Sequence, residues 1–479
     1  MKNISRLLLF FTLSLLLFNC KKPKDNIAEI SEIDEFIWKG LSDYYYWEDV
    51  APFISDASYE SEAHRNNFIN SFNGNHEYLF YSLLYEYGQI DRWSWIVDDY
   101  VALENALQGI AKTKGFEYGL VYKDQSQYEI YGYVKYIMPG SPADIAGLKR
   151  GDLFLEIDDT PLNTQNYKEL LSKSSYKLSL ASFVNNTLLT NGISYTLTEV
   201  EFQENPILMS KIFDLNGIKT GYLVYNGFVS SYDNALNVVF QNFIDQGVTE
   251  LILDLRYNGG GSVRSAAYLS SMIYGTNTDE IFSTSQYNAA LQDYFTQEYG
   301  DDFFNNYFAE TIAQSDGGSI PIHSLNLPRV HIIATRNSAS ASELVINGLR
   351  PYMDVVLIGS NTHGKYVGSF TIKDYIAQDV VNPNHTWAMQ PITFKIFNAQ
   401  GVSDYVNGLT PTIEVEEDVN NLIAFGEVSE PLLNVALNNI TGKAPDSNQI
   451  FIFNHRQFLD SKDLKLLGKD MYIDIDLKP

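Results

Sequence analysis

The chain has 479 residues, of which 45% are hydrophobic and 19% charged, a composition typical of a folded globular protein. This length exceeds one ordinary domain, so roughly two to four domains are expected. Acidic residues number 59 against 33 Lys and Arg. The resulting net charge of -26 argues against nucleic acid as a partner and against a basic membrane-binding surface. We expect no cofactor and no metal ion.

The N-terminus is typical of a signal peptide over residues 1–19. Two basic residues precede an apolar run at 7–18 that is short for a membrane span. The run ends in LFNC, where Cys20 is the only cysteine of the chain. This stretch resembles a bacterial lipobox, although Asn19 departs from the usual small residue. The resemblance implies a lipidated Cys20, a tether over 20–30, and a membrane anchor. The protein would then lie in the cell envelope, on a periplasmic or cell-surface face; the alternative is an ordinary secretory signal.

Residues 31–110 are predicted to form an N-terminal helical domain. Apolar and aromatic residues recur there at helical spacing, for example Phe36, Ile37 and Leu41 on one face of an amphipathic helix. No set of residues in this part has the spacing of metal ligands. A packing role beside the other domains is therefore expected.

Short strands and turns replace the helical pattern over 111–205. The stretch 131–162 combines a strand, a short helical turn that ends at Gly147, and a second strand with alternating apolar residues. It resembles a PDZ domain of the kind found in bacterial processing proteases, which implies a β-rich peptide-binding module. The resemblance places the loop that holds a peptide's C-terminal carboxylate at Tyr118, Gly119 and Leu120. For Gly119 the alternative is a simple turn or bulge glycine.

Three buried strands of a predicted α/β core, at 206–420, end in polar or glycine-rich loops. The strand at 250–255 leads into a glycine loop with Gly260 at its centre, whose spacing is neither a P-loop nor GxGxxG. The strand at 330–334 leads into a serine-rich turn, and the strand at 355–358 into a loop with Lys365. In a doubly wound sheet the carboxyl ends of parallel strands share one edge, so these loops should converge.

The serine-rich turn places Ser338, Ser340 and Ser342 where a strand passes into a helix. Exposed N–H groups at a helix N-terminus favour negative charge, which a nucleophilic serine needs when its attack creates an oxyanion. The alternative is a capping box formed by Ser340 and Glu343. We interpret Ser342 as a helix-cap residue, Ser338 as a polar residue of the turn and Ser340 as the nucleophile.

Together the glycine loop, the serine motif and the lysine loop resemble the C-terminal processing peptidases of family S41, serine proteases that pair Ser with Lys. The resemblance implies a ClpP/crotonase-like α/β protease core, with Ser340 as nucleophile and Lys365 as base. A lysine can act as a base only when burial lowers its pKa from about 10.4 toward neutrality. The N–H groups of Ala341 and Gly260 are predicted to form the oxyanion hole.

One position departs from the family pattern, because Ser369 stands where the family often has a glutamine that orients the lysine. Ser369 is kept as an uncertain third member of the site, and His363 is the rival base. A lipoprotein that binds peptides without cutting them is therefore a second hypothesis, and an enzyme acting on polysaccharide a third. The leading hypothesis is a serine endopeptidase whose polypeptide substrates are captured by their C-termini. The C-terminal extension, 421–479, offers no motif, and the long acidic segment 276–325 is interpreted as a lid or substrate wall.

Overall fold

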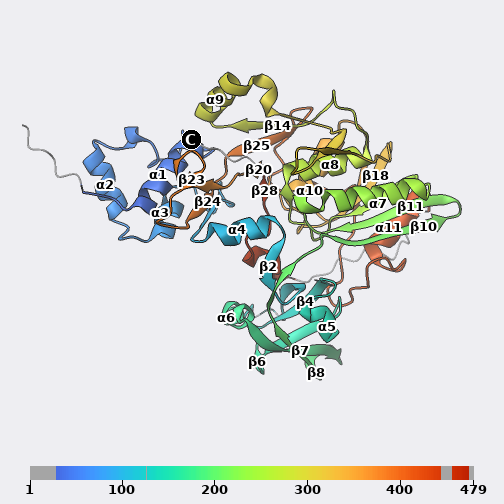
Figure 1. Ribbon diagram of the computed structural model, residues 1–479. Helices are drawn as coiled ribbons and strands as arrows, with labels where there is room; N and C mark the ends of the chain where they lie inside the picture. Colours follow the sequence, from blue (N-terminus) through green and yellow to red (C-terminus); the bar gives the residue numbers. More distant parts are fainter. Residues whose placement is uncertain (1–27, 124, 126, 444–455, 474–479) are drawn as a thin grey trace, which may run out of the picture.

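The computed structural model describes residues 28–443, apart from 124 and 126, and residues 456–473. The predicted signal peptide and Cys20 lie outside the described residues. Figure 1 shows an N-terminal helical part, a β-rich module at the bottom of the view and a larger α/β core. Within the described ranges, no helix is both long and apolar enough to cross a membrane.

The helical part consists of α1 (Glu32–Tyr44), α2 (Glu62–Asn70), α3 (His76–Leu83) and α4 (Tyr100–Leu107). Helix α1 begins after Ser31, whose side chain accepts a hydrogen bond from the Asp34 N–H and so caps the helix. Its apolar face, with Phe36, Ile37 and Leu41, is buried as the spacing predicted. The helix packs against α3 and against α9 (Ala289–Tyr299) of the core. The predicted helical character of this part is confirmed.

The β-rich module is a sheet in the order β27-β3-β4-β5-β7-β8. Its own strands are β3 (Phe116–Tyr122), β4 (Ile130–Ile137), β5 (Leu153–Ile157), β7 (Ser175–Val184) and β8 (Thr187–Thr198). Two short helices, α5 (Pro142–Ala146) and α6 (Tyr167–Ser172), accompany the sheet. As predicted, the first helical turn ends at Gly147, where a φ of 90° suits glycine. The edge strand β27 (Gln457–Asp460) comes from the far C-terminal end of the chain.

The core is built on a sheet in the order β10-β11-β12-β18-β19-β26. Its strands are β10 (Ile207–Leu215), β11 (Ile218–Tyr225), β12 (Glu250–Asp254), β18 (Arg329–Ala334), β19 (Asp354–Gly359) and β26 (Ile413–Glu414). Only β10 is antiparallel to its neighbour. Strand β12 alternates between two apolar clusters, Leu251 and Leu253 in one and Ile252 in the other, so both faces of the sheet are covered.

Contrary to the prediction from the sequence, this sheet is not doubly wound, because its strand order does not reverse. Strands β11, β12, β18 and β19 are neighbours in the same order as in the sequence, so every crossover advances in one direction. Right-handed crossovers of that kind put their helices on one face. These are α7 (Asp233–Asp245), α8 (Val263–Ile273) and α10 (Ala341–Leu349), drawn side by side in Figure 1, while α11 (Pro431–Ile440) covers the other face. Since the strands remain parallel, their carboxyl ends still share one edge.

The long acidic segment 276–325 is folded into the core. It contributes two strands, β14 (Ile281–Tyr287) and β15 (Asn305–Tyr307), to a second sheet in the order β15-β14-β25-β20. Helix α9 lies between these two strands in the sequence. The other two strands are β25 (Phe394–Asn398) and β20 (Val367–Gly368), which begins two residues after Lys365. This second sheet therefore supports the lysine loop, and its role as a lid remains a prediction.

Candidate active site

Ser340 lies at the turn between β18 and α10, in a backbone conformation that side chains rarely adopt. Its φ is 64° and its ψ is -116°, a region that costs a non-glycine residue about 1–3 kcal/mol. The residue is fully buried, and its Oγ has no hydrogen-bond partner among the residues that the structure describes. Ser340 is thus a strained serine with an uncommitted hydroxyl at a helix N-terminus.

The two neighbouring serines attach this turn to the glycine loop. Ser338 Oγ donates to the Leu255 carbonyl at 2.7 Å, and Ser342 Oγ donates to the Asn258 carbonyl at 2.9 Å. Ser342 lies inside the first turn of α10, so the interpretation of Ser342 as the helix cap is wrong; Ser340 occupies the cap position. The outer serines are therefore structural, and Ser340 alone keeps a free hydroxyl.

Glu343 ties the serine turn to the lysine loop. One carboxylate oxygen, Oε2, accepts the N–H groups of both Ser340, at 2.8 Å, and Lys365, at 2.9 Å. The other oxygen accepts Thr362 Oγ1 at 2.5 Å and the Gly364 N–H at 2.7 Å. The backbone nitrogens of Ser340 and Lys365 consequently lie within two hydrogen-bond lengths of each other. Of the two hydrogen bonds of a capping box, the structure has only the one from the Ser340 backbone N–H to the Glu343 carboxylate. The Ser340 hydroxyl is therefore left free.

Burial raises the pKa of Glu343 to about 7, although its four hydrogen-bond donors act in the opposite direction. The side chain is completely inaccessible to solvent. Near neutral pH this carboxyl group therefore titrates at the junction of the two loops. The sequence presented Glu343 only as a capping residue, and its contacts to the lysine loop carry no sequence signal.

Lys365 is buried, and its ammonium group has two partners from the end of the chain. Nζ lies 2.6 Å from Asp470 Oδ1 and donates to the Lys469 carbonyl at 3.1 Å. The loop itself contains no acid, as the sequence indicated, but tertiary folding brings one from 105 positions away. The lysine Nζ is therefore engaged in an ion pair with a carboxylate. Asp470 is therefore a site residue that no motif could have identified.

The glycine loop meets the serine turn at Gly260. A Cβ built on Gly260 would lie 2.7 Å from Ser340 Cβ, 3.0 Å from the Ala341 nitrogen and 2.5 Å from the Asp470 carbonyl oxygen. Only glycine fits there. The structure does not support Gly260 as an oxyanion donor, because its N–H already donates to Asn258 Oδ1 at 2.8 Å. The next N–H, of Gly261, donates to the Asp470 carbonyl at 2.6 Å.

Ser369 does not orient Lys365 in this structure. Its hydroxyl donates to Gln390 Oε1 at 2.5 Å, so Gln390 rather than the lysine takes up its side chain. The rival base, His363, is held by its backbone N–H to the Ser338 carbonyl at 3.0 Å. Burial, together with the nearby Lys469, lowers the pKa of His363 to about 4, so its imidazole is neutral at pH 7. His363 is therefore neutral at pH 7 but a weak base.

The carboxylate-binding loop predicted at Tyr118, Gly119 and Leu120 is wrong. These residues form the middle of strand β3, paired on one side with β4. Gly119 faces Tyr133 across the sheet, and a Cβ on it would lie 2.3 Å from the Tyr133 ring. The glycine therefore allows a tyrosine ring to pack on the strand, and the other edge of β3 pairs with β27.

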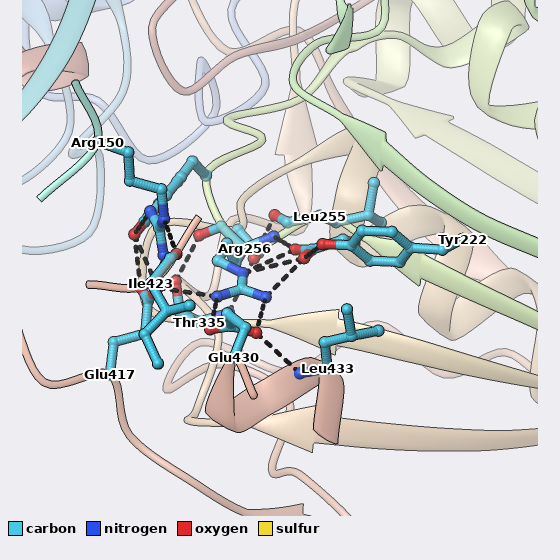
Figure 2. A network of polar contacts seen from close by, with 12 residues as sticks. Arg150, Tyr222, Leu255, Arg256, Thr335, Glu417, Ile423, Glu430 and Leu433 are labelled. Carbon is cyan, nitrogen blue, oxygen red and sulfur yellow. Dashed lines mark hydrogen bonds and ion pairs between the residues drawn. The ribbon is translucent and has the colours of Figure 1, made fainter. Parts of the chain in front are cut away.

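A buried ionic network joins the β-rich module to the base of the glycine loop (Figure 2). Arg256 is held by Asp254 at 2.7 Å and by Glu430 at 2.6 Å, and it shares Glu417 with Arg150 of the module. Although burial alone would raise the pKa of Glu417, Arg256 and Arg150 lower it to about 2. Removing one partner from a buried ionic network leaves an unpaired charge, which is strongly destabilising. The network therefore fixes the β-rich module, the α/β core and the glycine loop to one another.

Three protein-family models match the chain in the expected order. Residues 32–95 match the peptidase S41 N-terminal domain, residues 133–178 a PDZ domain, and residues 219–415 peptidase family S41. The order of these matches agrees with the order of the helical part, the β-rich module and the α/β core in the structure. Residues 219–415 thus match the S41 peptidase domain, which confirms the resemblance and the fold class expected from the sequence.

Curated relatives are distant. A carboxyl-terminal-processing protease of Picosynechococcus sp. is 24% identical over 241 residues, which is 48% of this chain and 49% of the relative. A chloroplastic C-terminal processing peptidase of Tetradesmus obliquus is 22% identical over 293 residues, 59% and 56% of the two chains. The chain thus spans about half the length of these relatives.

A solved structure from Bacteroides fragilis NCTC 9343, provisionally described as an S41 protease, resembles the whole fold. Its TM-score is 0.64 at 26% identity, with 87% of this chain and 98% of that chain covered.

Proposed function

We propose that the chain is a serine endopeptidase in which Ser340 is the nucleophile and Lys365 the base. The observation that carries this proposal is the uncommitted, buried Ser340 hydroxyl, which lies beside an N–H group that already holds a peptide carbonyl. Polypeptides are the substrates, and the PDZ module captures them, preferentially by a C-terminus. The chain is anchored in a bacterial cell envelope through a lipid on Cys20.

In the proposed reaction Ser340 Oγ attacks the scissile carbonyl carbon while the neutral amine of Lys365 takes its proton. The negative oxygen of the tetrahedral intermediate accepts hydrogen bonds from the N–H groups of Ala341 and Gly261. The lysine then returns the proton to the leaving amine, which leaves an acyl group on Ser340. Water, deprotonated by the same lysine, hydrolyses that ester and restores the serine.

The test is cleavage of an unfolded polypeptide by the full chain purified in detergent. We expect Ser340→Ala and Lys365→Ala each to lower kcat by at least about a thousandfold, because neither half of the pair works alone. Ser315→Ala and Lys39→Ala are matched exposed controls that should leave kcat unchanged. Loss of activity in His363→Ala but not in Lys365→Ala would assign the base to the histidine instead.

Equal cleavage by the wild type and both site variants, or cleavage by none of them, would contradict the endopeptidase proposal. The second outcome would favour the peptide-binding alternative. The anchor is tested separately by growth with labelled palmitate: the wild type should take up label and Cys20→Ala should not. An unlabelled wild type would contradict the lipoprotein proposal alone.

A further inference from the structure

The end of the chain adds a strand to the PDZ module. Strand β27 pairs antiparallel with the free edge of β3, with Leu459 opposite Leu120 and Asp460 opposite Gly119. Phe458 places its ring 5.2 Å from the Tyr122 ring of β3 and 5.1 Å from the Tyr167 ring of α6. An extended segment that extends a sheet edge and inserts a side chain beside a helix is a recurrent mode of peptide recognition. The module therefore already holds a peptide, and that peptide is its own chain.

The same segment continues into the catalytic cleft as β28 (Met471–Tyr472). It pairs in parallel with β13 (Gly261–Ser262) of the glycine loop, and on its other side with Ser369. The Ser369 N–H donates to the Met471 carbonyl at 3.0 Å, and the Ile473 N–H donates to the Ser369 carbonyl at 3.1 Å. Backbone pairing on both sides is how a protease cleft holds an extended substrate.

Asp470, the residue just before this strand, occupies the reactive position. Its carbonyl oxygen receives the Gly261 N–H at 2.6 Å, next to Ser340, while its carboxylate holds Lys365 Nζ at 2.6 Å. The first contact resembles the hydrogen bond to a bound scissile carbonyl, and the second engages the Nζ of Lys365 in an ion pair. A peptide bound this way fills the site and disables the base in one step.

Buried charges between the two contacts fix the path of the segment. Asp460 forms an ion pair with Lys135 at 2.5 Å, and both side chains are almost inaccessible to solvent. Although burial alone would raise the pKa of Asp460, Lys135 holds it below its usual value. On the same stretch Ser461 and Lys465 both bind Glu117, and Lys462 Nζ donates to the Asn226 carbonyl at 2.9 Å. Such complementarity is that of a built site, since an unpaired charge there would be costly.

We propose that residues 457–473 are an intramolecular pseudosubstrate that closes both the peptide groove of the PDZ module and the Ser340 cleft. This inference rests on the proposed endopeptidase function. The enzyme is latent in this conformation, and it becomes active when an extended polypeptide with an apolar side chain takes the place of Phe458 on β3 and draws the segment out. A cavity of about 580 Å³, lined by His363, Lys365 and Asp470 among others, lies beside the segment and gives an incoming chain access to it.

Two substitutions in the full chain test the pseudosubstrate, assayed with an unfolded polypeptide. Asp470→Asn removes the anion that holds Lys365, and Phe458→Ala weakens the strand on β3 far from Ser340. We expect each to raise the initial rate about tenfold, because the competent fraction of molecules rises. Asp214→Asn, at an exposed pair with Lys219, is the matched control and should not change the rate. Unchanged rates in both variants would overturn the proposal, while loss of activity in Ser340→Ala would leave the proposed function standing.

A second readout does not depend on activity. In the Ser340→Ala background, saturating polypeptide should accelerate amide hydrogen exchange at residues 457–460 and at Ile473, whose hydrogen bonds would be released. Unchanged exchange would overturn the pseudosubstrate. Mass spectrometry of the active wild type should find the chain intact; cleavage between Asp470 and Met471 would show that the segment is a substrate and would also overturn it.

Discussion

Glu343→Gln is expected to remove a loss of stability that the wild type shows as the pH rises, and at the same time to lower activity. In the folded chain the pKa of Glu343 is raised from 4.5 to about 7 by burial. A raised pKa means that the stability contributed by this group is fully present below pH about 4.5 and is lost as the pH rises through about 7. The difference of about 2.5 pKa units corresponds to about 3 kcal/mol.

Glutamine has the shape of the protonated glutamic acid and cannot ionise. We therefore expect the stability of Glu343→Gln relative to the wild type to rise by about 3 kcal/mol between pH 4.5 and pH 8.5. The activity should change in the opposite sense. The amide keeps only one acceptor oxygen for four donors, so the Ser340 and Lys365 loops shift and kcat falls by about 10- to 100-fold.

Urea unfolding at the two pH values, combined with the polypeptide cleavage assay, measures both effects. Glu298→Gln on the exposed face of α9 is the matched control and should change neither quantity. A difference in unfolding free energy that is the same at pH 4.5 and pH 8.5 would refute the raised pKa. An unchanged kcat would refute the positioning role of Glu343.

Two further predictions concern the PDZ module and its attachment. Glu417→Gln leaves Arg150 and Arg256 without their shared carboxylate, so the free energy of unfolding at pH 7 should fall by about 3–5 kcal/mol in a urea titration. The control Glu416→Gln, at the exposed neighbouring position, should have little effect in the same titration. Because the pKa of Glu417 is about 2, the wild type should keep this stability above pH 4.5 and lose it as the pH falls toward 2. Equal free energies of unfolding of the wild type and Glu417→Gln at pH 7 would contradict the role of the network. Gly119→Ala places a methyl group against the Tyr133 ring and should destabilise the module by about 1–3 kcal/mol in thermal unfolding. A neutral effect on stability with a loss of C-terminal peptide binding would instead restore Gly119 to a carboxylate-binding role.

Local patterns determined much of this protein from the sequence alone. The strands before Gly260, Ser340 and Lys365 could be located because buried parallel strands are continuous apolar runs, and their loops converge because the carboxyl ends of such strands share an edge. The PDZ module was recognisable because its turn, helix and strand follow one another without interruption. Ser340 could be separated from its neighbours because the motif and the strand-to-helix junction agree.

Contacts between distant segments were decided only by the tertiary structure. Asp470 reaches Lys365 across 105 positions, and the segment that carries it has no pattern of its own, because its backbone pairs with partners from other parts of the chain. For the same reason Gly119 was misread, since the Tyr133 ring that requires it lies on another strand. The direction of winding was also open, because parallel strands look alike in sequence whatever their spatial order. The sequence determined which residues are candidates for the proposed serine peptidase chemistry, and the fold determined that residues 457–473 contact that candidate site.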